Sequence, residues 1–139
     1  MWIEEKDYRM IREWMPIPTV DAIITFEGKF LLLKRNNPPV QGEWWLPGGR
    51  VRKGEALEDA VRREVQEETG LTCQSLRQVG VINQIFPECH TISICYRVEV
   101  ATPHVTMNTE HSDYQWVSTL PPGSHRYLKT MIEAAGLPT

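Results

Sequence analysis

Residues 48–71, GGRVRKGEALEDAVRREVQEETGL, join a glycine-rich approach to an unusually acidic helix. Apolar residues recur at helical spacing and Gly70 suits a C-cap, so the pattern predicts a helix from Ala56 to Thr69. Three carboxylates fall in the same half of the helical wheel as the apolar stripe. They are Glu64, Glu67 and Glu68. Like charges at these spacings repel one another unless a positive group lies among them.

Two interpretations of this helix follow from its charges. Most glutamate-rich helices present a solvated acidic face, here supported by Arg62 and Arg63 at helical spacing. Alternatively, the carboxylates hold a hard divalent cation, because Mg²⁺ prefers oxygen ligands and commonly bridges to substrate phosphates. Pro47-Gly48-Gly49, just upstream, is expected to end any strand and to bring backbone amides and carbonyls near a phosphate or metal.

The rest of the chain predicts an α+β fold, with a mixed sheet between helices, because the element order is neither strictly alternating nor all-β. The predicted helices are Glu5–Glu13, Ala56–Thr69 and a C-terminal helix between an N-cap at Ser124 and Gly136. The predicted strands are Thr19–Phe26, Lys29–Arg35, Trp44–Leu46, Leu76–Phe86, Thr91–Ala101 and Tyr114–Val117.

Composition limits the remaining classes of protein. With 139 residues, of which 41% are hydrophobic, residues 1–139 are expected to form one domain with one core. A net charge of −3 disfavours a nucleic-acid partner. Apolar runs are short and the N-terminus is charged, which predicts a cytoplasmic protein with neither a signal peptide nor a membrane span. The three cysteines form no CxxC pair, so neither disulfides nor a zinc knuckle is indicated.

The acidic stretch also resembles a known family signature. The Nudix box reads G, five residues, E, seven residues, REU, one residue, EE, one residue, GU, where U is an apolar residue. Its fixed positions are all filled, by Gly49, Glu55, Arg63-Glu64, Val65, Glu67-Glu68, Gly70 and Leu71. The resemblance to Nudix hydrolases implies an α/β/α sandwich with a central mixed sheet, in which the box binds Mg²⁺ or Mn²⁺ against a diphosphate.

Family roles carry over onto the matching residues of the box. The resemblance implies metal ligands at Glu64, Glu67 and Glu68, completed by the Gly48 carbonyl. Glu67 and Glu68 then belong to the catalytic set, while Glu55 and Arg63 match supporting positions. Arg63 is expected to orient carboxylates rather than to touch the substrate.

Outside the box, the flanks resemble GDP-mannose mannosyl hydrolases. The similar stretches are PIPTVDAII (16–24), FLLLKRNNPPVQGEWWLPGGRV (30–51) and EHSDYQWVS (110–118). This likeness implies that Arg35 and Arg50 contact the diphosphate, that Asp21 binds substrate, that Glu110 is a further metal ligand and that His111 is the general base. The competing interpretations are ordinary surface arginines, an Asp21 on an edge strand pointing to solvent and a solvent-exposed loop His111.

The chain departs from that subfamily in one respect, which affects the bond that is cleaved. GDP-mannose mannosyl hydrolases have a degraded box and substitute at the sugar carbon, whereas the complete box here implies attack of metal-activated water on phosphorus. The leading hypothesis is a Mg²⁺-dependent hydrolase of a nucleoside diphosphate linked to another moiety, with nucleotide sugars favoured. The alternatives are a house-cleaning (d)NTP pyrophosphohydrolase and a non-catalytic regulatory domain that binds nucleotides. Subfamily likeness and the apolar residues Trp2, Ile11 and Trp14 suggest a homodimer.

Overall fold

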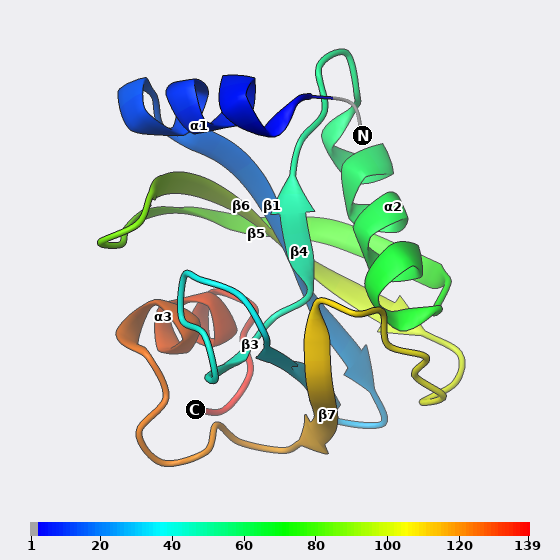
Figure 1. Ribbon diagram of the computed structural model, residues 1–139. Helices are drawn as coiled ribbons and strands as arrows, with labels where there is room; N and C mark the ends of the chain where they lie inside the picture. Colours follow the sequence, from blue (N-terminus) through cyan, green and yellow to red (C-terminus); the bar gives the residue numbers. More distant parts are fainter. Residues whose placement is uncertain (1–2) are drawn as a thin grey trace.

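The computed structural model describes residues 3–139, which form one mixed sheet with helices around it (Figure 1). The helices are α1 (Glu5–Trp14), α2 (Leu57–Thr69) and α3 (Arg126–Ala134); the strands are β1 (Ile17–Phe26), β2 (Lys29–Arg35), β3 (Trp44–Trp45), β4 (Gly48–Arg50), β5 (Cys73–Ile85), β6 (His90–Val100) and β7 (His111–Val117). The strand order is β3-β2-β1-β6-β5, with β4 paired to β1 and β7 paired to β2. Because β1 and β6 run parallel while the other pairs are antiparallel, the sheet is mixed, as predicted.

Alternate residues of the central strands supply two hydrophobic layers. On β1, Val20 and Ala22 pack toward α2, whereas Ile23 packs toward α3. This follows from the two-residue period of a strand, since a sheet covered on both faces has apolar residues at consecutive positions. The α/β/α sandwich predicted from the sequence is therefore confirmed.

The loop that leads into α2 differs from the prediction. Pro47-Gly48-Gly49 was expected to end any strand, yet Gly48–Arg50 forms β4 and pairs with β1 from Thr19 to Asp21. A Cβ at Gly48 would collide with the Val20 carbonyl oxygen and the Asp21 carboxylate. The glycine here permits close approach of two backbones rather than a break in the strand.

Most other element boundaries lie within a few residues of the prediction. β2 matches it fully, and Gly70 caps α2 in the left-handed conformation, with φ of 71°. β7 begins at His111 rather than Tyr114 because His111 pairs with Arg35 of β2. The N-cap of α3 is His125, whose Nδ1 accepts a hydrogen bond from the Tyr127 amide, and not Ser124.

Helix α1 lies apart from both hydrophobic layers, and none of its residues is buried. Ile11 and Trp14 are 38% and 75% exposed, so neither covers the core of its own chain. Trp2 lies outside the described residues, and the homodimer stays a prediction. Within residues 3–139, no helix is long and apolar enough to cross a bilayer.

Candidate functional site

Two glutamates of α2 are buried although they are acidic. Glu64 and Glu68 are 9% and 2% exposed, whereas the side chain of Glu67, on the same helix, is about half exposed. Burial raises the pKa of Glu64, and it raises the pKa of Glu68 well above its usual range, to which the nearby Glu64 charge adds. The fold therefore holds two carboxyl groups where their charges are disfavoured unless a cation accompanies them.

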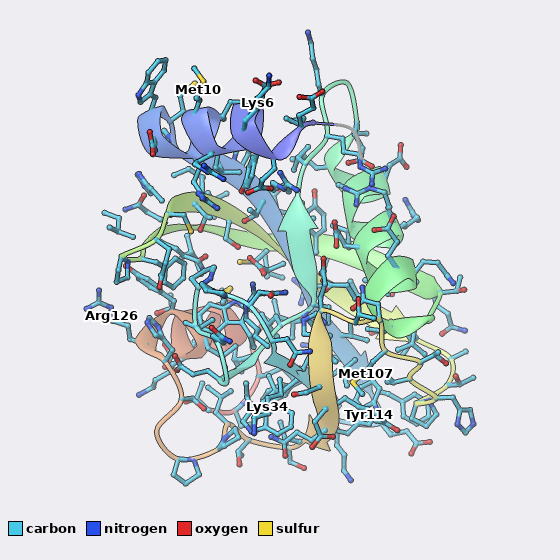
Figure 2. The ribbon with its side chains drawn as sticks, in the orientation of Figure 1. Lys6, Met10, Lys34, Met107, Tyr114 and Arg126 are labelled. Carbon is cyan, nitrogen blue, oxygen red and sulfur yellow. The ribbon has the colours of Figure 1, made fainter. Side chains whose placement is uncertain are left out.

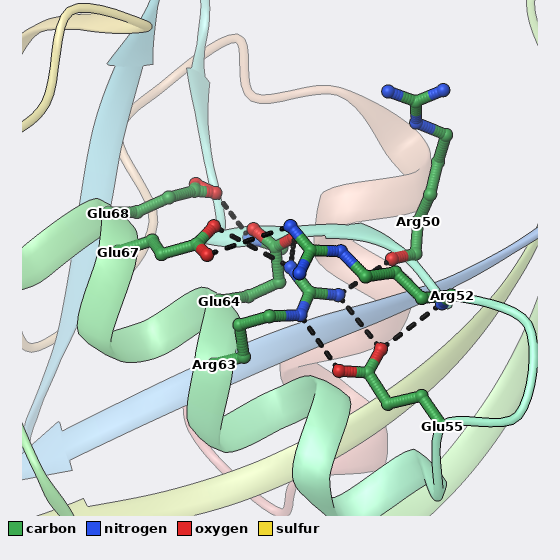
Figure 3. Close-up of polar contacts among 8 residues, drawn as sticks. Arg50, Arg52, Glu55, Arg63, Glu64, Glu67 and Glu68 are labelled. Atoms are coloured by element: carbon green, nitrogen blue, oxygen red, sulfur yellow. Dashed lines mark hydrogen bonds and ion pairs between the residues drawn. The ribbon is translucent and has the colours of Figure 1, made fainter. Parts of the chain in front are cut away.

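Arg63 organises the outer side of this acidic pair (Figure 3). Its Nε and Nη2 donate to the two Glu55 carboxylate oxygens at 2.8 and 2.9 Å, and its Nη1 donates to Glu64 Oε1 at 2.6 Å. Nη2 also donates to the Arg50 carbonyl at 3.0 Å, which fixes the end of β4. These bonds raise the pKa of Arg63 above its ordinary value and lower the pKa of Glu55 below its own.

These contacts show where each charge of the acidic helix lies. The helix does have a solvated face, on which the exposed side chains of Arg62 and Glu58 form an ion pair with 3.9 Å between Nη1 and Oε2. Glu64 and Glu68 point inward instead. The expected orienting position of Arg63 agrees with the contacts it makes.

The glycines of β4 let the backbone lie against these carboxylates. The Gly48 amide donates to Glu68 Oε1 at 3.0 Å. A Cβ at Gly49 would lie 2.5 Å from Glu64 Oε1, so a side chain there would displace the carboxylate. The close approach of β4 to α2 thus depends on the absence of a side chain at Gly49, and the close approach of β4 to β1 on its absence at Gly48.

One carboxylate oxygen has no partner, and it makes the site suitable for a cation. Glu68 Oε2 is buried and accepts no hydrogen bond from residues 3–139; the His111 Nε2 atom lies 3.8 Å from it. A buried acceptor without a partner destabilises a fold by about 1–3 kcal/mol. A hard divalent cation takes such oxygen ligands, so the chemistry of this oxygen suits Mg²⁺ or Mn²⁺. It is a single ligand and not a preassembled site, because no three His, Cys, Asp or Glu side chains of residues 3–139 are gathered closely enough to hold a metal ion.

His111 differs from what the sequence led us to expect. It is 5% exposed at the start of β7, so a solvent-exposed loop position is wrong. Burial, with a contribution from Arg35, lowers the pKa of His111 to about 4, and the imidazole does not titrate near neutral pH as expected. Glu110 precedes it in an exposed turn.

Asp21 is also buried, at 7% exposure, and it lies on β1 in the middle of the sheet. Its carboxylate accepts a hydrogen bond from the buried Ser93 hydroxyl of β6. Burial raises the pKa of Asp21 to about 6. The alternative of an edge-strand residue pointing to solvent is therefore wrong.

Both arginines that the flanking resemblance singled out are held in place. Arg35 Nε donates to the Pro39 carbonyl at 2.8 Å and to the Asn37 carbonyl at 3.2 Å. The Arg50 guanidinium lies 3.8 Å from the centre of the Tyr8 ring and points away from the Arg63 cluster (Figure 3). Both arginines are half-buried, and whether they contact a diphosphate stays a prediction.

A cavity of about 500 Å³ is lined by several of the predicted site residues. Its volume is suited to a small-molecule ligand. Its walls come from α1, β1, the loop after β2, β3, β4 and the tip of the β5–β6 hairpin. The lining residues include Arg35, Asp21, Gly48, Gly49, Arg50 and Glu110. The α2 carboxylates lie directly behind its glycines, since they contact Gly48 and Gly49.

Sequence reasoning missed part of this cavity. Tyr8 and Arg12 reach it from α1, and Gln84 and Phe86 reach it from the end of β5. No local pattern marks these residues, because their position depends on contacts between distant segments. Trp45 is buried, lines the cavity and meets Phe86 edge to face, with the ring centres 6.1 Å apart.

Comparisons with known proteins agree with this geometry. The NUDIX domain family model matches residues 15–120. The low-salt glycan biosynthesis protein Agl8 of Haloferax volcanii is 29% identical over 140 aligned residues, which cover 95% of this chain and 90% of that protein. An ADP-ribose pyrophosphatase of Methanocaldococcus jannaschii is 41% identical over 101 residues, which cover 70% of this chain and 60% of the relative.

Solved structures show the same arrangement of elements. A MutT NUDIX hydrolase from Burkholderia pseudomallei superposes with a TM-score of 0.78 at 27% identity, covering 86% of this chain and 98% of that one. The residues that the family model matches include β4 and α2.

Proposed function

Because the chain belongs to the NUDIX family and is a Nudix hydrolase, we propose that it cleaves nucleotide sugars at the diphosphate in a reaction that depends on Mg²⁺. The observation that carries the proposal is the partnerless Glu68 carboxylate oxygen beside the Gly48 amide, within a complete box. Gly48 and Gly49 line the adjoining cavity and also lie against Glu68 and Glu64, so a cation held by these carboxylates would be close to a diphosphate bound in the cavity.

The residues that would hold the cation are the four carboxylates that the box and the flanking resemblance single out, together with the Gly48 carbonyl. The carboxylates are Glu64, Glu67, Glu68 and Glu110. When bound, Mg²⁺, or Mn²⁺ in its place, supplies charge neutralisation and a more acidic bound water. Arg63 keeps Glu64 oriented through its bond to Glu64 Oε1.

The cavity residues bind and orient the substrate. Arg35 and Arg50 donate to diphosphate oxygens, a task suited to the planar, permanently charged guanidinium. Asp21 lies deeper on β1 and accepts hydrogen bonds from substrate hydroxyls. Glu110 lines the cavity from an exposed turn, so it is better placed than the buried His111 to take a proton from water.

The complete box favours attack on phosphorus over attack on the sugar carbon. The attacking water oxygen then bonds to one phosphorus as the bridging P–O bond breaks, and the water loses a proton to a nearby base. The products are a nucleoside monophosphate and a sugar phosphate. The similarity to a glycan biosynthesis protein of Haloferax volcanii supports a nucleotide-sugar substrate.

A second candidate substrate is a nucleoside triphosphate. A third arginine, Arg12, lines the cavity with Arg35 and Arg50, and a triphosphate has a further phosphate group to accept its hydrogen bonds. Hydrolysis of a triphosphate at this site would release a monophosphate and pyrophosphate.

The test is ³¹P NMR of the products formed from GDP-mannose, ADP-ribose and dGTP with Mg²⁺, using Glu68→Gln as the control. Nucleoside monophosphate with sugar phosphate supports the proposal, whereas monophosphate with pyrophosphate from dGTP alone favours the second candidate. GDP with free mannose means attack at carbon. Equal rates for the control variant would remove Glu68 from the reaction.

A further inference from the structure

Helix α1 turns its apolar residues outward. Only Tyr8 and Arg12, one turn apart, are partly covered within the helix, whereas Met10 and Trp14 are 49% and 75% exposed. Met10 projects from the outer side of α1 in Figure 2. A ten-residue helix is marginal on its own in water. Its few inward contacts therefore determine where α1 lies.

Those inward contacts join α1 to the cavity. The Tyr8 ring has the Arg50 guanidinium carbon 3.8 Å from its centre and the Arg12 guanidinium carbon 5.5 Å from it. All three residues line the same cavity. An aromatic ring attracts cations through its quadrupole, and arginine stacks on it readily. One tyrosine thus gathers two guanidinium groups, one from α1 and one from β4.

Charged groups of both signs line the cavity: the guanidinium groups of Arg12, Arg35 and Arg50 and the carboxylates of Asp21, Glu88 and Glu110. Burial and the Glu88 charge raise the pKa of the Cys89 thiol at the hairpin tip, and the charges of Arg12 and Arg35 lower it. Two guanidinium groups that share one ring repel each other, and an anion placed between them relieves this repulsion. The arrangement suits a ligand with several phosphate oxygens.

We infer that α1 is a diphosphate-recognition element, in which Tyr8 positions Arg50 and Arg12 donates a further guanidinium to the ligand. The inference rests on the proposed function, because it takes Arg50 as a ligand of the substrate diphosphate. The new element of the inference is that α1, a surface helix outside the core, contributes to the affinity for the substrate diphosphate. Tyr8 acts through Arg50 and is a positioning residue; Arg12 is a binding residue.

The first test compares Tyr8→Leu with Tyr8→Phe and with Trp14→Leu. Phenylalanine keeps the ring and its cation–π contact, while Trp14→Leu removes an aromatic side chain from the outer side of the same helix. We expect Tyr8→Leu to raise KM by about 3- to 10-fold with kcat within about twofold, the size of one cation–π contact. Tyr8→Phe and Trp14→Leu should retain the KM of the unsubstituted chain. An unchanged KM in Tyr8→Leu, or an equal rise in Trp14→Leu, would overturn the inference.

The second test needs no turnover and examines Arg12. Calorimetric titration with inorganic pyrophosphate in the presence of Mg²⁺ is carried out on the unsubstituted chain, Arg12→Gln and Arg9→Gln, which removes a charge from an exposed position of α1. We expect several-fold weaker binding in Arg12→Gln alone. Equal affinities, or no binding by the unsubstituted chain, would contradict the inference. Pyrophosphate binding without cleavage of any nucleotide would contradict the proposed function but not the role of α1.

Discussion

The two sides of the site are built in opposite ways. On the α2 side, Glu64 and Glu68 are buried, Arg63 bonds to three partners and the backbone of β4 lies against the carboxylates. On the α1 side, no residue of the helix is buried, and the ring of Tyr8 contacts the Arg50 guanidinium of β4. The difference teaches that the part that places reacting groups needs rigid packing, whereas the part that contacts the ligand can lie on an exposed helix.

The largest effect is expected from Glu68→Gln on the α2 side. The amide oxygen can still accept the Gly48 hydrogen bond, but the negative charge is lost. We expect kcat to fall by about 100-fold or more, because a cation site contributes several kcal/mol to the transition state. The thermal midpoint should not fall, since a buried charge that disfavours the fold is removed. Glu133→Gln, on the exposed side of α3, is the matched control, and a comparable loss there would refute the assignment.

Next in size is the effect of Gly49→Ala. The new methyl group would lie 2.5 Å from Glu64 Oε1 and would push the carboxylate out of place. We expect about a 10- to 100-fold loss of kcat/KM, the range seen when a metal ligand loses its orientation. Gly80→Ala is the control, because a Cβ there meets Ala134 at an ordinary 3.6 Å. Steady-state kinetics on the two variants measure kcat/KM. An unchanged kcat/KM in Gly49→Ala would show that Glu64 can move aside without loss of activity.

Arg63→Lys should produce an intermediate effect. Lysine keeps the charge but cannot donate in a fork to Glu55 while also reaching Glu64. We expect about a tenfold loss of kcat and a lower thermal midpoint. Arg62→Lys, one residue earlier and paired only loosely on the exposed side, should change neither quantity. If both variants behave alike, Arg63 does not organise the carboxylates.

The smallest effect is expected from Trp14→Gln on the α1 side. Trp14 is 75% exposed and packs in neither hydrophobic layer of the described chain. Its replacement should change the free energy of unfolding by less than about 0.5 kcal/mol, as for other surface positions. Urea denaturation measures this quantity. A drop of about 2 kcal/mol would mean that α1 is packed against something in solution, for example a second copy of the chain.

The same contrast explains how much the sequence could predict. The fold and the box were accessible because β2, α2 and the Gly70 cap depend on local patterns. The burial of His111 and Asp21 could not be predicted from local patterns. His111 is buried because β7 begins early and pairs with β2, and Asp21 is buried because β1 lies in the middle of the sheet. The paired strand at Gly48–Arg50 was hidden by glycines that ordinarily signal a break. Nothing local placed Tyr8 beside Arg50, because the two residues meet only in the folded chain.

The central claim is that the buried carboxylates of α2 hold the divalent cation, and Mn²⁺ binding followed by electron paramagnetic resonance tests it most directly. Free Mn²⁺ gives a strong signal that is lost on binding, so affinity is read without any substrate or turnover. The unsubstituted chain is expected to bind Mn²⁺, and Glu68→Gln to bind it at least about tenfold more weakly, with Glu133→Gln unchanged. Equal Mn²⁺ affinity in the unsubstituted chain and in Glu68→Gln would contradict the account.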